Sequence, residues 1–89
     1  MDNRSCPVDV ISVCTAEGVI TPLRLRIRSE DRTFVVVDIE QILSRKRVMY
    51  VGVETQVFLC RGTLEDQPWL FELRYTLRSH NWSLDRRVY

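Results

Sequence analysis

The sequence predicts an all-β fold: a small antiparallel meander of five to six strands that forms a bent sheet or a small barrel of the SH3-like or OB-like kind. Three observations indicate this class. Apolar and polar residues alternate with a period of two along most of the chain, and turn-forming residues interrupt the alternation at short intervals. The 89 residues, of which 45% are hydrophobic, suffice for one small core.

Composition and charge set the expected organisation. We expect residues 1–7 to be a flexible N-terminus and residues 8–89 to be a single β domain. The formal net charge of +1 provides no global attraction to nucleic acid or to an acidic membrane. No apolar stretch approaches the ~18 residues that span a bilayer, and the first residues lack a signal-peptide pattern. We therefore expect a cytoplasmic protein with no membrane partner.

The first hairpin is predicted from two extended runs, residues 8–16 and 19–28, joined by Glu17-Gly18. Glycine supplies the positive φ that a tight turn requires, so this dipeptide is a suitable connection. Within the second run, Pro22 cannot donate a hydrogen bond to a ladder and marks an edge position or a bend.

The register of this hairpin has two solutions. A two-residue loop places Val10 opposite Leu25, on the apolar side formed by alternate residues. A shift by one residue, with Gly18 in a bulge, brings Ile11 and Val13 onto the apolar face instead. The pattern leaves both open.

A third strand is predicted over residues 33–39, which are rich in β-branched side chains. A loop at Glu30-Asp31 would connect it to the preceding strand. The resulting pairs are Ile27 with Phe34, Leu25 with Val36, Arg26 with Val35 and Arg24 with Val37. The arginines would then stand beside apolar neighbours, which their long stems can cover.

Residues 40–52 have the least regular pattern. Asp38 followed by Gln41 has the spacing of a helical capping box, which predicts at most one short helical turn near residues 39–47. The residues that would share its apolar face are Ile39, Ile42 and Leu43. An extended strand end followed by a basic loop at residues 45–47 fits the pattern equally well.

The C-terminal half predicts two further hairpins. A strand over residues 53–62 leads through a turn at residues 64–68 into a strand over residues 69–79. One face of that last strand carries Trp69, Phe71, Leu73, Tyr75 and Leu77. A two-residue turn at His80-Asn81 would return the chain with Trp82 and Leu84 on the same face.

Five arginines are the candidate binding residues: Arg24, Arg26, Arg28, Arg74 and Arg78. Alternate residues on a strand lie about 6.6 Å apart, which is close to the phosphate spacing along a single nucleic-acid strand. With aromatic residues for base stacking, the row fits single-stranded nucleic-acid binding as an alternative function. Interspersed acidic residues and the core-like alternation of the aromatic residues argue against it.

A protein partner or a second copy of the chain is the favoured interpretation. A small sheet with an edge strand can accept another strand, and arginine and aromatic residues commonly anchor interfaces. We therefore expect a non-catalytic binding domain that acts in protein–protein interaction or self-association.

No catalytic, cofactor-binding or metal-binding residue is predicted. His80 is the single histidine and falls in a turn. Cys14 and Cys60 lie in apolar strands, where buried and inert thiols are expected, and the closely spaced cysteine pair of a zinc site is missing. The acidic pairs Glu30-Asp31 and Glu65-Asp66 fall in solvent-facing turns. We expect no cofactor and no enzymatic activity.

The order of the segments "ISVCTAEGVITPLRLRIRSED", "VVVDIEQILSRK", "VFLCR", "FELRYTL" and "WSL" resembles a family of small uncharacterised bacterial proteins found in clostridia and their relatives. The matching positions are Ile11, Val13, Gly18, Pro22, Arg24, Phe58, Cys60, Glu72, Leu73, Arg74, Tyr75, Trp82 and Leu84. The resemblance covers most of residues 8–86. It implies a compact bacterial β domain and assigns neither a function nor a catalytic residue.

Overall fold

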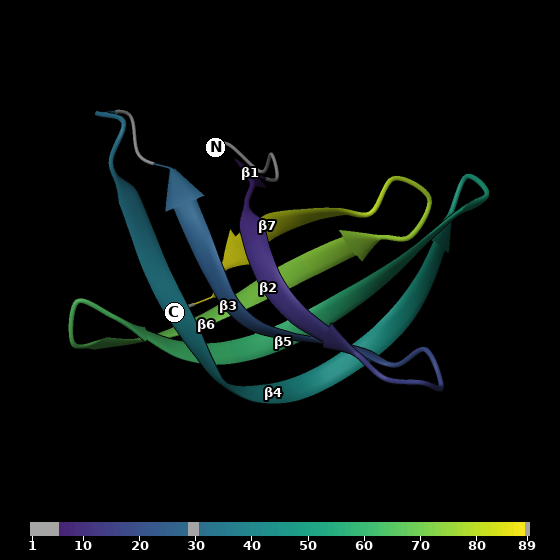
Figure 1. Cartoon of the computed structure of the whole chain (residues 1–89), viewed down its shortest axis with the longest axis horizontal. Coiled ribbons are helices and arrows are strands. Elements are labelled where there is room, and N and C mark those ends of the chain that lie inside the picture. The colour runs from purple at the N-terminus through teal and green to yellow at the C-terminus, as the bar shows by residue number, and fades with distance from the viewer. Residues whose placement is uncertain (1–5, 29–30, 89) are drawn as a thin grey trace.

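The computed structural model describes residues 6–28 and 31–88, which form seven antiparallel strands and no helix (Figure 1). The strands are β1 (Cys6–Pro7), β2 (Asp9–Cys14), β3 (Ile20–Arg28), β4 (Phe34–Tyr50), β5 (Val53–Leu64), β6 (Gln67–Thr76) and β7 (Asn81–Arg87). They form one sheet in the order β1-β7-β6-β5-β4-β3-β2.

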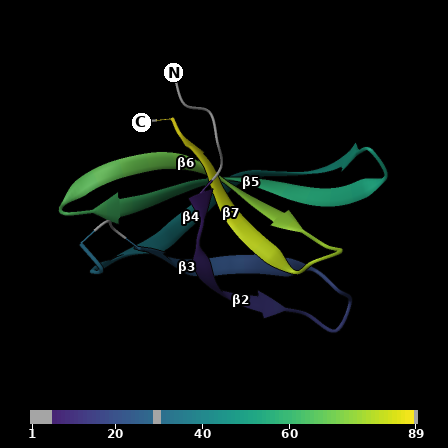
Figure 2. The same ribbon diagram turned by 90° about the horizontal axis from the view of Figure 1, so that it is seen from above.

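The N-terminal strand joins both ends of this order. β1 pairs with β7, whereas β2, which follows after Val8, pairs with β3 at the other end. The sheet therefore curls into a half-barrel (Figure 2). The strand count exceeds the predicted five to six because the N-terminal strand is divided at Val8. Cys6 and Pro7, which we expected in the flexible N-terminus, form β1, and residues 1–5 lie outside the described residues.

The first hairpin has the register of the predicted two-residue loop only away from its turn. Next to the turn the pairing is shifted by one residue, with Val13 opposite Thr21, because residues 16–18 form the loop. Val10 pairs with Leu25, which is 2% exposed. The predicted placement of Ile11 and Val13 on the apolar face is wrong, because these side chains are 58% and 49% exposed.

A bulge in β3 changes which residues of that strand reach the core. The register shifts between Ile11 and Ser12, so that Leu23 is the extra residue of β3. Leu23 is consequently exposed and Pro22 is fully buried. Pro22 lies beyond the last β3–β4 pair, so its missing N–H does not interrupt that ladder.

The predicted pairing of β3 with β4 is wrong by one residue. Leu25 pairs with Val37 rather than Val36, and both members of the pair are buried. The physical reason is that burial of one face fixes the register more strongly than the length of the connecting loop. Arg26 accordingly lies opposite Val36. Of the predicted loop at Glu30-Asp31, Glu30 lies outside the described residues.

β4 is a strand from end to end, so the helical turn near residues 39–47 and the basic loop at residues 45–47 are both wrong. Two register shifts against β5 make Glu40 and Leu43 extra residues. Each bulge advances the inward-facing position by three residues instead of two, so Ile39 and Ile42 both pack against the core. The three-residue spacing of Ile39 and Ile42 is also the spacing of residues on one face of a helix, which explains the wrong prediction. Figure 1 shows that β4 is strongly bent along its length.

The bend in β4 requires a glycine on β5. Gly62 pairs with Ile39. A Cβ atom at Gly62 would lie 2.5 Å from the carbonyl oxygen of Asp38 and 3.0 Å from Cγ1 of Val37. Only glycine therefore leaves room for the two backbones to approach this closely.

The last two hairpins match the prediction in outline. Glu65 and Asp66 form a two-residue turn in which both residues have positive φ. Phe71 and Leu73 are fully buried, as their alternation predicts. The final turn is longer than predicted, because residues 77–80 form it.

The longer turn alters the pairing of the aromatic residues but not their face. Tyr75 lies directly opposite Trp82, with ring centroids 4.7 Å apart. His80, rather than Asn81, has positive φ.

The core lies inside the curl and is formed by β3 to β6. Its fully buried residues are Leu25, Val37, Phe58, Cys60, Phe71 and Leu73. Partly buried side chains from the N-terminal strand, including Val8 and Val10, close this cluster on the side of β2. The N-terminal strand is therefore a wall of the core and not an appendage.

Candidate protein-binding edge

The arginine row of β3 lies on the outer face, and two of its members are paired with aspartates. Nε of Arg24 donates to Oδ1 of Asp38 at 2.5 Å. Arg26 donates to Oδ2 of Asp9 through Nε at 2.9 Å and through Nη2 at 2.6 Å. One Arg–Asp pair thus joins β3 to β4, and another joins β3 to β2.

The same arginines cover an aromatic ring. The guanidinium carbons of Arg26 and Arg28 lie 4.1 Å and 5.5 Å from the ring centroid of Phe34. Arginine over an aromatic face gains a cation–π interaction while its head stays in water. Arg26 and Arg28 therefore lie beside apolar neighbours, although these are Val36 and Phe34 and not the predicted Val35. For Arg24 the expectation is wrong, because it lies opposite Asp38 instead of Val37.

These pairs limit what the row can bind. The ion-pair partners are exposed, so each pair contributes about 0–1 kcal/mol to stability. A phosphate would still have to compete with a carboxylate for the guanidiniums of Arg24 and Arg26. The row is consequently a compensated surface and not a set of three free cations.

Arg74 and Arg78 do not join the row. Arg74 belongs to β6, which is separated from β3 by β4 and β5. Its Nη2 donates to Oδ2 of Asp85 at 3.4 Å, while its buried Nε has no hydrogen-bond partner among the described residues. Arg78 lies in the turn between β6 and β7. The five predicted arginines therefore do not form one site.

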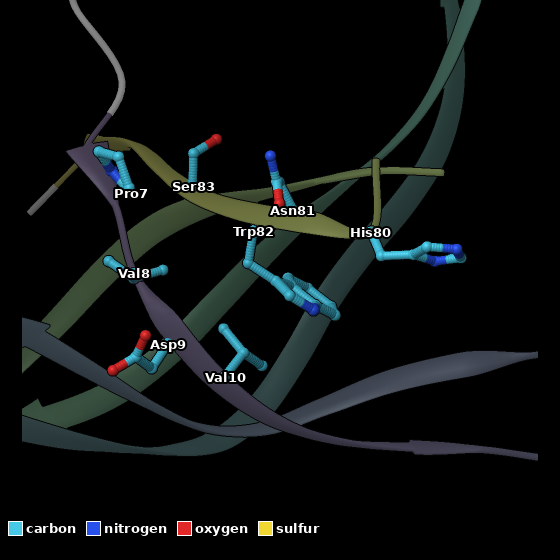
Figure 3. Close-up of a pocket in the computed structure, with 8 residues that line it drawn as sticks. All are labelled: Pro7, Val8, Asp9, Val10, His80, Asn81, Trp82 and Ser83. Atoms are coloured by element: carbon cyan, nitrogen blue, oxygen red, sulfur yellow. The ribbon is translucent and has the colours of Figure 1, made fainter. Parts of the chain in front are cut away.

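A different feature is found where the N-terminal strand separates from β7. The backbone N–H of Val8 donates to the carbonyl oxygen of Trp82 at 3.2 Å, and the strands diverge beyond this bond. A groove of about 620 Å³ opens between them, lined by residues 7–10 and 80–83 (Figure 3). In Figure 3 the Trp82 ring projects from β7 into the space beside β2.

Aromatic rings support this wall of the groove. Trp82 packs against Tyr75 and also against Phe58, at a centroid distance of 5.7 Å. The Tyr75 hydroxyl and Nδ1 of His80 are 2.9 Å apart and share a hydrogen bond. The contacts with Phe58 and Tyr75 therefore fix the Trp82 ring in this wall of the groove.

The edge of β2 beyond the groove is open. Val8 directs its N–H away from β3, and alternate residues of a strand direct their backbone groups to the same side. The backbone groups of Val10 and Ser12 therefore face away from β3. Nothing within the described residues forms a ladder with this side of β2.

This edge lacks the usual protection against strand pairing. Edge strands commonly carry lysine, proline or inward-pointing charges. β2 has the sequence DVISVC, in which Asp9 is the single charged residue and is held by Arg26. The exposed side chains of β2 include Ile11 and Val13, both β-branched. Such an edge favours pairing with another extended chain.

The sequence contained this signal, but its meaning depended on the register. One predicted register placed Ile11 and Val13 on the apolar face of the hairpin, and the other placed them on the opposite face. In the structure both side chains are exposed, at the free edge of the sheet. The groove beside Trp82 forms because β2 and β7 diverge, and no local sequence pattern predicts this divergence.

The cysteines and acidic residues form no metal-binding cluster among the described residues. Burial raises the pKa of the Cys60 thiol to about 12, against a weaker opposing effect of Arg45. Cys14 is exposed, contrary to expectation, because it lies at the end of β2 where no further layer covers the strand. The described residues also contain no helix of the length and apolarity that crossing a membrane requires.

Comparisons with family models, with curated proteins and with solved structures found no match to this chain.

Proposed function

We propose that this protein is a non-catalytic protein-binding domain that takes up an extended strand at the free edge of β2. The observation that carries the proposal is the unprotected edge: backbone groups of Val10 and Ser12 that face away from β3, next to the exposed side chains of Ile11 and Val13. In strand addition, main-chain hydrogen bonds provide affinity, and pockets for alternate side chains provide specificity.

The groove beside Trp82 is the pocket that this mode of binding needs. It adjoins the start of the free edge, at Asp9 and Val10. A strand added to β2 would direct one of its side chains towards the Trp82 ring. Tryptophan is enriched among residues that dominate binding energy, because a large rigid ring loses little entropy on contact.

Two related proposals concern the fold and the alternative function. We regard the curled sheet as a small barrel of the SH3-like or OB-like kind, in which the N-terminal strand completes the wall. We also propose membership of the clostridial-type family, on the basis of the segment order and the matching positions alone. Single-stranded nucleic-acid binding is the weaker function, because Arg24 and Arg26 are compensated by aspartates.

The test is a selection from a random-peptide display library, followed by mapping of amide shifts with a selected peptide. We expect peptides with alternating apolar residues, and shifts centred on the amides of Val10, Ser12 and Trp82. Selection of no peptide, or shifts confined to another surface, would contradict the proposal.

Two substitutions form a matched pair for this test. Val13 and Val36 are both 49% exposed, but Val13 is on the edge strand and Val36 is on β4. Val13→Lys places a charge on the edge and should weaken peptide binding by about tenfold or more. Val36→Lys introduces the same charge away from the edge and should leave the affinity unchanged.

A further inference from the structure

The open edge of β2 is chemically suited to one particular strand, its own copy. We propose that two copies of this chain associate through antiparallel pairing of β2 with β2, across a two-fold axis, to give one continuous sheet. The inference rests on the proposed function, because it names the occupant of the same edge. Symmetric pairing of identical patches is the commonest route to a homodimer.

The positions of the free backbone groups restrict the register. With pairing centred on the middle of β2, the two-fold axis passes beside either Ser12 or Ile11. Because the even-numbered residues face outwards, Ser12 at the centre forms a hydrogen-bonded pair and Ile11 a non-hydrogen-bonded pair. With Ser12 opposite Ser12 of the second copy, Val10 faces Cys14 and Ile11 faces Val13. With Ile11 at the centre, the charged Asp9 would lie opposite Val13.

The register centred on Ser12 matches side chains by type. The exposed Ile11 and Val13 of each copy meet Val13 and Ile11 of the other, which forms an apolar cluster of four β-branched residues. Asp9 lies outside the paired segment and keeps its ion pair with Arg26, so that no like charges meet across the axis. The match of apolar with apolar residues, in a segment that carries no charge, favours a second copy as the partner.

There is also room for the second strand. Counting along the antiparallel strands from the Val8–Trp82 hydrogen bond, Asn81, the first residue of β7, lies beside Asp9. The segment from Ile11 to Cys14 therefore runs past the end of β7. The partner strand would add on this open part, and the groove beside Trp82 would remain at its end.

Sedimentation velocity across micromolar to millimolar concentrations tests the association. We expect the mass of the wild-type protein to rise from one copy towards two. Val13→Lys should weaken the association by at least about tenfold, and Val36→Lys should behave as the wild type. A wild-type protein that stays a single copy throughout would overturn the inference, as would a dimer that Val13→Lys leaves intact.

A cross-link tests the register independently of any loss of folding in the lysine variant. Residues directly opposite each other in a hydrogen-bonded pair have Cα atoms about 5.5 Å apart, which is within disulfide range. Ser12→Cys, with Cys6 and Cys14 replaced by serine, should therefore form a disulfide-linked dimer on mild oxidation. The matched control carries cysteine at Thr63 on β5 in the same background and should stay monomeric. Equal cross-linking of both variants would contradict the register.

The two proposals fail separately. If the protein stays monomeric but selected peptides shift the amides of Val10 and Ser12, the second copy is excluded and strand addition stands. If neither association nor peptide binding involves β2, both proposals fall.

Discussion

Replacement of Gly62 by alanine should destabilise the fold. The same replacement normally stabilises a protein where the strand has space for a Cβ atom. Alanine restricts the unfolded chain more than glycine does, which favours folding by about 0.4–1 kcal/mol where the native conformation accepts it. Gly62 lies in β5 with ordinary strand geometry, since its φ is not in the left-handed region. Without a collision, the substitution would therefore raise stability.

The collision at this position reverses the sign. The new Cβ atom would lie 2.5 Å from the carbonyl oxygen of Asp38, 3.0 Å from Cγ1 of Val37 and 3.3 Å from Cε1 of Phe71. The first contact is with backbone, and Val37 and Phe71 are both buried, so none of the three can rotate freely away. Overpacking of this kind costs about 1–3 kcal/mol. The net expectation is a loss of stability.

Urea and thermal unfolding measure the effect. For a domain of this size, each 1 kcal/mol lowers the Tm by about 4–8 °C. Gly18→Ala is the informative control, because a Cβ atom there meets nothing within 4 Å and is penalised only by its positive φ of 88°. A Gly62→Ala protein as stable as the wild type would refute the close approach of β4 to β5.

Three further predictions concern the turn at Val51, the buried thiol and the arginine row. Val51 has a φ of 50°, which a β-branched residue rarely adopts. Val51→Asn should therefore stabilise the fold by about 1 kcal/mol. An unchanged or lower Tm would show that Val51 does not strain the turn. The pKa of about 12 predicts that iodoacetamide at pH 8 modifies the two exposed cysteines and spares Cys60 until the protein unfolds. The Cys60 thiol ionises near pH 9 in the unfolded chain and near pH 12 in the folded one. The free energy of unfolding should therefore fall by roughly 1.4 kcal/mol for each pH unit between these values. Cys60→Ala should reduce this slope. Asp9→Asn removes the acidic partner of Arg26 and should increase affinity for single-stranded DNA at low salt; equal affinity would show that the aspartate does not mask the row.

The sequence pattern predicted the class of the fold because alternation is a local property. Phe71 and Leu73 alternate with polar neighbours and are buried as expected. Glu65-Asp66 is a turn in which both residues have positive φ, and Asp is one of the residues that tolerate this conformation. Each of these features depends on a few neighbouring residues, which a single sequence displays.

The errors arose where bulges changed the period. Ile39 and Ile42 are three residues apart, as on a helix, but both face the core because Glu40 is an extra residue in a strand. Bulges are set by the twist and closure of the whole sheet and have weak local signals. The one-residue shift of the β3–β4 pairing has a different origin, because that pairing is continuous and the mutual burial of Leu25 and Val37 decided it.

The binding residues were the least predictable part. The arginine row was visible in the sequence, but its compensation by Asp9 and Asp38 required knowledge of the neighbouring strands. The groove beside Trp82 involves β2 and β7, which lie at opposite ends of the chain. No local pattern relates such distant residues, so this site could only be recognised from the structure.

The division of the N-terminal strand between β7 and β3 also has a consequence for the order of folding. Strands β2 to β7 form by successive hairpins, whose contacts are local and form quickly. The pairing of Cys6 with Leu84 joins nearly the first residue to nearly the last, so its loop-closure entropy is the largest in the sheet. During synthesis this contact must wait until the C-terminal strand has left the ribosome. The pairing of β1 with β7 should therefore form last during folding. Because this pairing covers the core beside Val8 and Trp82, it should also be the first to open when the protein unfolds.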